Sequence, residues 1–260
     1  IFNNHDPRPW WQIFAPFQPL TGSVPLRLFT NDKSMDVITR QMGSNAAFNL
    51  QTGERLWERG QKKYQHGSAA YYKPKNLVIF GNADHDITAY NAKDGTIIWK
   101  HETIRSIKYP PAIDEALKLV VATSFDGNIY ILDVETGERK AAIKTNDICY
   151  TTPLITHGKI FSGSGDRHLY IIDAHTFEVI KKMDCYARVY SSPKLIDGNV
   201  VFGTGGGRII ELNPDSLEVV GETLLPDAIT NAISASPQHD VLYASTFMNE
   251  IYAIKRTVLE

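Results

Sequence analysis

The sequence predicts an all-β fold, a β-propeller of four-stranded antiparallel blades, and three observations support this. A turn recurs along the chain: Gly53, Gly95 and Gly137 lie 42 residues apart, and Phe177 and Leu217 then follow at intervals of 40. Each copy carries four short apolar segments over about 40 residues, which is the length of a propeller blade. No segment shows the 3.6-residue apolar period of an amphipathic helix.

Within each copy we expect four strands in one order. The innermost is expected at 109–113 (YPPAI) and its equivalents, the second at 77–81 (LVIFG), the third at 46–50 (AAFNL) and the outermost at 55–60 (RLWERG). The middle strands are apolar on both faces, as expected where a neighbouring blade covers each side. Asp-Gly and Thr-Gly suit turns with positive φ, so we expect exposed turns whose residue types can vary from one repeat to the next.

The number of third strands predicts six blades. These strands lie near residues 46, 87, 129, 169, 209 and 251, and little chain remains after the last one for an outer strand. We therefore expect residues 10–14 to pair beside 251–255 and close the ring, which removes an exposed sheet edge. Residues 1–260 then form one domain, with 1–21 as closing strand and linker and 22–256 as repeats, within a longer polypeptide. Seven blades, one of them outside this chain, is the alternative.

Composition limits the kinds of partner. The chain has 43% hydrophobic residues and a formal net charge of -2, which gives no reason to expect a nucleic-acid partner. No apolar run approaches the roughly 20 residues that a membrane helix needs, so we expect a soluble, monomeric domain with no membrane span. The sequence does not indicate a compartment. Cys149 and Cys185 are too few for a disulfide framework and are expected to be free and buried.

Two glycine-rich segments superficially suggest catalytic loops. GTGGGR at 203–208 and SGSGD at 162–166 both lie between strands of a hairpin. A phosphate loop or a nucleophile elbow needs a helix directly after it, and no helix is expected there. The Cys and His spacings that are typical of metal sites are also missing from the sequence. We therefore expect no catalytic residue and no metal ligand.

The segments YNAKDGTIIW, FNLQTGERLW and YSSPKLIDGNVVFGT resemble the pyrroloquinoline-quinone-type (PQQ-like) repeat, a propeller family. The resemblance covers residues 22–256 and implies the propeller fold. Its members include quinoprotein dehydrogenases, assembly scaffolds and appended binding domains. A quinoprotein of this family implies an adjacent cysteine pair, a calcium site, a catalytic Asp and eight blades. This chain has no adjacent cysteines and is short for eight blades, so no cofactor is expected, although PQQ remains an alternative.

Polar loops predict a binding face around the propeller axis. The loops that lead into the innermost strands and the loops that join second to third strands should share this face. Its candidate partner-binding residues are His66, Asp84, His85, Lys108, Asp166, Arg167, His168, Arg188 and Arg208. The clustered cations favour an acidic peptide or a carboxylate-bearing ligand, although the hairpin tips could also be merely solvated.

Aromatic residues add two further expectations. Tyr109, Tyr150 and Tyr190 recur 41 and 40 residues apart and should line or plug the axis. Trp10 and Trp11 lie in the part of the chain that is least like the repeats, where they could serve ring closure or form an aromatic interface. The sequence thus favours a non-enzymatic binding or scaffold module with a protein or peptide partner. The alternative is a small-molecule sensor or a domain derived from a quinone-binding enzyme.

Overall fold

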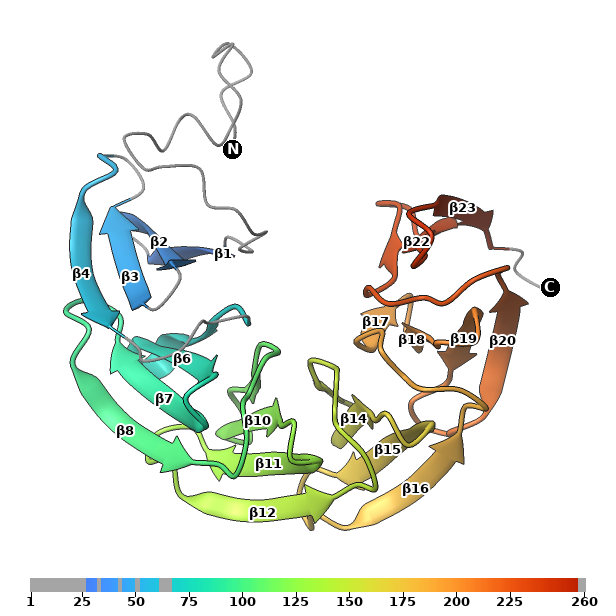
Figure 1. The fold of residues 1–260 in the computed structure, drawn as a ribbon, viewed down its shortest axis with the longest axis horizontal. Coiled ribbons are helices and arrows are strands. Elements are labelled where there is room, and N and C mark those ends of the chain that lie inside the picture. Colours follow the sequence, from blue (N-terminus) through green and yellow to red (C-terminus); the bar gives the residue numbers. More distant parts are fainter. Residues whose placement is uncertain (1–26, 32–33, 42–43, 50–51, 61–66, 257–260) are drawn as a thin grey trace.

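The structure, a computed structural model, describes residues 27–31, 34–41, 44–49, 52–60 and 67–256. These ranges form 23 strands, β1 to β23, and one short 3-10 helix, η2, at Lys73–Lys75. The strands are arranged as six antiparallel sheets that lie side by side along an arc (Figure 1). The all-β propeller and its six repeats are therefore confirmed. The expected closing segment, residues 10–14, lies outside the described residues.

Five of the sheets have four strands and the last has three. The first three sheets contain β1 Arg27–Asn31, β2 Ser34–Gln41, β3 Ser44–Asn49 and β4 Arg55–Gly60; β5 Ala70–Tyr72, β6 Leu77–Asn82, β7 Asp86–Asn91 and β8 Ile97–Glu102; and β9 Ala112–Asp114, β10 Leu119–Thr123, β11 Asn128–Asp133 and β12 Arg139–Lys144. The last three contain β13 Leu154–Thr156, β14 Lys159–Gly163, β15 His168–Asp173 and β16 Val179–Asp184; β17 Lys194–Ile196, β18 Asn199–Gly203, β19 Arg208–Leu212 and β20 Val219–Leu224; and β21 Ser234–Ala235, β22 Val241–Ser245 and β23 Ile251–Lys255.

The innermost strands are shorter than the sequence pattern suggested. The strand expected at 109–113 begins only at Ala112, because Pro110 and Pro111 have no backbone N–H to donate to the ladder. Other strand ends agree closely with expectation, and β4 and β23 have the predicted bounds. Both glycine-rich segments lie in hairpins, between β14 and β15 and between β18 and β19, as expected.

The core consists of five apolar clusters, each lying between two successive sheets. Alternate residues of one strand face opposite neighbours. Val120 and Ala122 of β10 pack toward the β5–β8 sheet, whereas Val121 packs toward the β13–β16 sheet. This is why the middle strands are apolar on both faces. Each blade depends on the next for burial, as in other repeat proteins.

In two of the blades a tryptophan packs over the turn of the following blade, and we call this contact the lock between blades. The Trp57 ring of β4 covers Gly95, and its Nε1 donates to the Ala92 carbonyl at 2.8 Å. Trp99 of β8 covers Gly137 in the same way and donates to the Val134 carbonyl at 2.9 Å. A Cβ on either glycine would lie 2.6 Å from the ring, and both glycines have positive φ, +70° and +73°. Glycine is therefore required there for two reasons, its conformation and the space.

The residue type at the turn changes along the chain for a reason that the sequence pattern did not reveal. Gly95 and Gly137 are buried beneath rings, so the turns are not simply exposed and tolerant. In the next blades the tryptophan position holds Ala141 and Lys181, and a larger residue replaces the glycine. Phe177 and Ala141 pack against one cluster, and Lys181 Nζ donates to the Leu217 carbonyl at 2.6 Å. Phe177 and Leu217 keep positive φ, +62° and +58°, so the predicted turn register is confirmed.

Candidate functional site

One end of the propeller carries the predicted axial loop face. The loops that lead into innermost strands hydrogen-bond to the hairpin loops between second and third strands in four successive blades. Backbone N–H groups of the hairpins donate to lead-in carbonyls: Phe125 to Ser106, Gly165 to Ile148, Gly205 to Arg188, and Phe247 to Ala228. The two sets of loops therefore share one face, and each hairpin is anchored to the loop beside it.

The hairpin tips have a common backbone conformation. The equivalent residue in five successive blades has positive φ, between +61° and +81°: His85, Gly127, Arg167, Gly207 and Asn249. Asp126-Gly127 is therefore a turn, as expected. Three of these positions hold a side chain other than glycine in a conformation that glycine adopts more easily, so the tips share a backbone conformation although their residues differ.

An arc of aromatic rings with flanking cations lies on this face. Lys108 Nζ is 4.5 Å from the centroid of the Phe125 ring, a cation–π distance. Phe125 contacts Tyr150 edge-to-face at 5.4 Å, and Tyr150 contacts Tyr190 at 5.0 Å. Arg188 is exposed and donates to the Tyr190 hydroxyl at 3.2 Å. We refer to these five residues as the axial arc.

The three tyrosines are not in equivalent positions, which corrects the sequence alignment. The N–H groups of Ile107, Cys149 and Val189 donate to equivalent hairpin carbonyls, so these residues share a register. The next position therefore holds Lys108, Tyr150 and Tyr190, and Tyr109 lies one residue later. Burial raises the pKa of Tyr109, and nearby Tyr150 and Tyr190 raise it further, so Tyr109 lies in the neighbourhood of the other two tyrosines.

Phe125 is a residue of the candidate site that sequence reasoning missed. It directly precedes the Asp126-Gly127 turn, and glycine occupies the equivalent position in the next two blades, at Gly165 and Gly205. An apolar ring directly before a predicted Asp-Gly turn was the available signal. Phe247 occupies the same position in the last blade and is 71% exposed.

Asp166 has a structural role that also limits its exposure. Its Oδ2 accepts hydrogen bonds from the Tyr170 hydroxyl at 2.6 Å and from the Asn146 N–H at 3.0 Å. Burial raises the pKa of this carboxyl, but the hydrogen bonds from Tyr170 and from backbone N–H groups outweigh that and lower it overall. His168 Nδ1 lies 2.8 Å from the Asp166 carbonyl oxygen, so this pair braces its own hairpin.

The predicted cations do not form one group. Arg188 joins the axial arc and lies 3.9 Å from Asp147, whereas Arg208 pairs with Glu222 of β20 and stacks 5.3 Å from the Tyr186 ring centroid. Arg167 is exposed at its hairpin tip. His66, Trp10 and Trp11 lie outside the described residues. The structure therefore brings Lys108 and Arg188 together with the aromatic rings, while Arg208 lies beside the outer strand.

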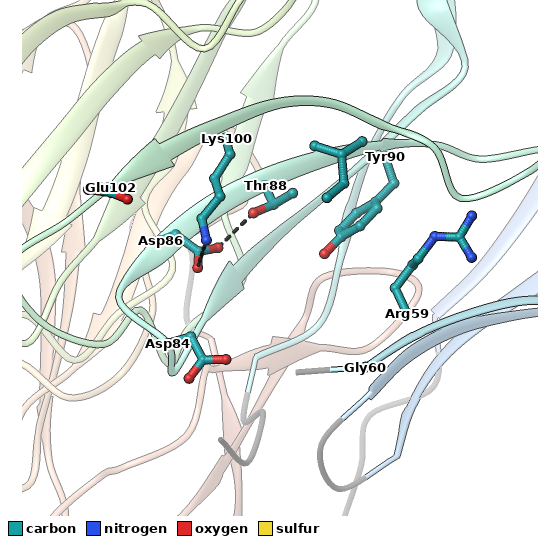
Figure 2. Close-up of a pocket in the computed structure, with 9 residues that line it drawn as sticks. Arg59, Gly60, Asp84, Asp86, Thr88, Tyr90, Lys100 and Glu102 are labelled. Carbon is teal, nitrogen blue, oxygen red and sulfur yellow. Dashed lines mark hydrogen bonds and ion pairs between the residues drawn. The ribbon is translucent and has the colours of Figure 1, made fainter. Parts of the chain in front are cut away.

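Asp84 lines a hollow of about 490 Å³ between the first two blades (Figure 2). Charged groups inside it already pair with one another. Lys100 Nζ is 3.1 Å from Asp86 Oδ2, and the Thr88 hydroxyl donates to Asp86 Oδ1 at 2.6 Å. Arg59 donates to carbonyls of the next turn, those of Gly95 at 2.8 Å and Asp94 at 2.9 Å. These contacts join two blades, and the axial arc is the better candidate for recognition.

Cysteine and metal chemistry give no further site in the described ranges. Cys149 and Cys185 are free and buried, and burial raises their pKa to about 11 and about 12. No group of three or more His, Cys, Asp or Glu side chains in the described ranges could hold a metal ion. No helix in the described part of the chain is long and apolar enough to cross a membrane.

Comparison with known proteins agrees with the fold. The family model described as "Outer membrane protein assembly factor BamB" matches residues 18–183, and a model described as a domain of unknown function matches 112–259. The crystal structure of BamB from Moraxella catarrhalis superposes with a TM-score of 0.73 at 14% identity, covering 88% of this chain and 72% of that one. The beta-alanine-activating enzyme of Danio rerio is 26% identical over 101 residues, 37% of this chain but 9% of that enzyme.

Proposed function

Because the chain belongs to the family described by outer membrane protein assembly factor BamB, we propose that it is a non-enzymatic binding module for an acidic protein segment. The binding surface in this proposal is the axial arc of Lys108, Phe125, Tyr150, Arg188 and Tyr190. The observation that carries the proposal is the contact chain from the Lys108 ammonium through three rings to the Arg188 guanidinium.

The chemistry of the axial arc favours carboxylates and side chains that pack on rings. Arg and Lys at its two ends offer charge-assisted hydrogen bonds to Asp or Glu. The rings between them supply rigid contact area that loses little conformational entropy on binding. Phe247 and Met248, 71% and 68% exposed on the last blade, extend the apolar part of the same loop face. A partner segment with acidic residues on either side of an apolar or aromatic residue fits this layout.

An array of peptides that vary in acidic and aromatic content tests the proposal. We expect acidic peptides to bind and the double variant Lys108→Glu/Arg188→Glu to weaken binding by about tenfold or more, with added salt reducing parent binding. The matched control is Lys75→Glu/Lys93→Glu, which reverses two exposed charges near η2 and the β7–β8 turn, on the opposite end of the blade.

Equal loss of binding in both double variants would refute the axial site, because it would reflect net charge alone. The same chain is incubated with pyrroloquinoline quinone and calcium to test the alternative. A bound ligand at 100 times its dissociation constant adds about 2.7 kcal/mol to the free energy of unfolding. An increase of that size in the free energy of unfolding, together with no binding on the peptide array, would favour the quinone-derived domain instead.

A further inference from the structure

A tyrosine and an aspartate make the same contact in the third and fourth blades. The Tyr130 hydroxyl donates to Asp126 Oδ2 at 2.8 Å, and the Tyr170 hydroxyl donates to Asp166 Oδ2 at 2.6 Å. Each tyrosine lies in the third strand of its blade, and each aspartate lies at the hairpin tip before that strand. Both tyrosines are buried in clusters shared with the preceding blade. The two rings therefore fill the same space at two successive blade interfaces.

The second blade keeps the aspartate but lacks the tyrosine. Thr88 follows the hairpin-tip residue Asp84 by four positions, as Tyr130 and Tyr170 follow their own aspartates. Thr88 also faces the preceding blade, because it lines the hollow of about 490 Å³ together with Arg59 of β4. A threonine carries no ring. The hollow therefore lies where a tyrosine ring lies at the next two blade interfaces.

The lysine beside the ring is also retained in the second blade. In the fourth blade Lys182 Nζ lies 5.0 Å from the centroid of the Tyr170 ring and 3.6 Å from Asp166 Oδ2. Lys100 is its equivalent, because it pairs with Thr88 across the strands as Lys182 pairs with Tyr170. The second blade thus has the aspartate and the cation of this arrangement, without the ring between them.

The opposite wall of the hollow comes from the first blade. Figure 2 shows Arg59 of β4 across the hollow from Asp84 and Lys100. Arg59 has the strand position of His101, whose ring contacts the Tyr130 ring edge-to-face with centroids 5.8 Å apart. A ring in the hollow would therefore lie beside a guanidinium instead of an imidazole, and guanidinium groups stack well on aromatic faces.

We propose that the hollow between the first two blades binds a small phenol. The ring of the phenol takes the place that Tyr170 has in the fourth blade, and its hydroxyl donates to Asp84. A carboxylate accepts several hydrogen bonds at once, as Asp166 does from Tyr170 and from the Asn146 N–H, so Asp84 can accept the phenol without losing another partner. The volume of the hollow lies within the range of small-molecule sites, about 300–1,000 Å³.

The charges around the hollow favour a neutral ligand over an anion. Lys100 already pairs with Asp86 at 3.1 Å, and Arg59 donates to two carbonyls of the next turn. The carboxylates of Asp84 and Glu102, which also line the hollow, would repel an anionic ligand. An uncharged hydroxyl can donate to a carboxylate without this repulsion. The ligand of the hollow is thus chemically distinct from the acidic segment proposed for the axial arc.

Titration of the full chain with p-cresol, followed by saturation-transfer NMR, tests the proposal. We expect the parent to bind with a Kd of about 1 mM or below. The matched ligand 4-methylanisole has the same ring but no hydroxyl to donate, and it should bind about tenfold more weakly or worse. Thr88→Tyr should abolish binding, because the new ring fills the hollow as in the next two blades.

A pair of aspartate variants gives a test that does not depend on Thr88→Tyr folding. Asp84→Asn should weaken p-cresol binding by about fivefold or more, because a neutral acceptor replaces a carboxylate. Asp126→Asn changes the equivalent hairpin tip, where Tyr130 already fills the space, and should bind as the parent does. The double variant Lys108→Glu/Arg188→Glu should also bind p-cresol as the parent does, so this result is independent of the axial arc.

Four results would overturn the proposal. The first is no binding of p-cresol by the parent at concentrations up to about 10 mM. The second is equal affinity for p-cresol and 4-methylanisole, which would mean that no carboxylate accepts the hydroxyl. The third is unchanged binding in a folded Thr88→Tyr chain, which would place the ligand elsewhere. The fourth is an equal loss in Asp84→Asn and Asp126→Asn, which would reflect a general effect of removing a carboxylate.

Discussion

Replacing Gly137 with alanine tests the lock between blades most sharply. Gly137 has φ +73°, and an added Cβ would lie 2.6 Å from Cδ2 and Cε3 of Trp99. A residue with a Cβ at this φ costs about 1 kcal/mol. The contact adds a cost of overpacking, about 1–3 kcal/mol, because the Trp99 ring is held by its hydrogen bond to the Val134 carbonyl. The free energy of unfolding should therefore fall by about 2–4 kcal/mol.

Gly198→Ala is the matched control for the backbone term alone. Gly198 has φ +75°, and nothing lies within 4 Å of its Cβ direction, so this change should cost about 1 kcal/mol. Urea unfolding at 25 °C, followed by tyrosine and tryptophan fluorescence, measures both values. In a Trp99→Ala background, Gly137→Ala should also fall to about 1 kcal/mol, because the ring is gone. Equal losses for Gly137→Ala and Gly198→Ala in the parent would refute the lock.

Three further predictions concern buried groups. Removing the hydroxyl in Tyr170→Phe should lower the free energy of unfolding by about 1 kcal/mol in urea, because the Asp166 carboxylate loses one of its donors; no loss would mean that another donor replaces it. Asp86→Ala should cost about 2–4 kcal/mol, since Thr88 and Lys100 lose their common partner; Lys100→Met in that background should recover part of the loss, and no recovery would contradict the pairing. The free energy of unfolding should fall as pH rises above about 9, because the thiols of Cys149 and Cys185 ionise near their ordinary pKa of 9.0 in the unfolded chain but only at about 11 and about 12 in the folded chain. In the double variant Cys149→Ala/Cys185→Ala the free energy of unfolding should depend less steeply on pH. An unchanged pH dependence would assign the effect to other groups.

Sequence periodicity predicted the repeating strands because packing between blades requires apolar residues at the same positions of each strand. The bounds of β4 and β23, the six repeats and the conformation of the turn at Gly95 and Gly137 are all confirmed. Such features depend on local pattern and on burial that every blade shares. They can therefore be recognised in one sequence without knowledge of any contact.

Features that depend on contacts between blades were harder to predict. The turn at Phe177 differs from that at Gly137 because Ala141 replaces a tryptophan in the preceding blade. The chain did contain this signal, since a turn glycine follows each of Trp57 and Trp99. The one-residue offset of Tyr109 and the inward role of Asp166 depend on loop hydrogen bonds, which have no periodic signature.

A crystal structure of the chain with its tightest acidic peptide from the array would test the central claim most directly. The proposal predicts peptide carboxylates at Lys108 and Arg188 and an apolar peptide side chain on the Phe125 and Tyr150 rings. A peptide bound along the outermost strands, or in the hollow beside Lys100 and Asp86, would contradict recognition by the axial arc.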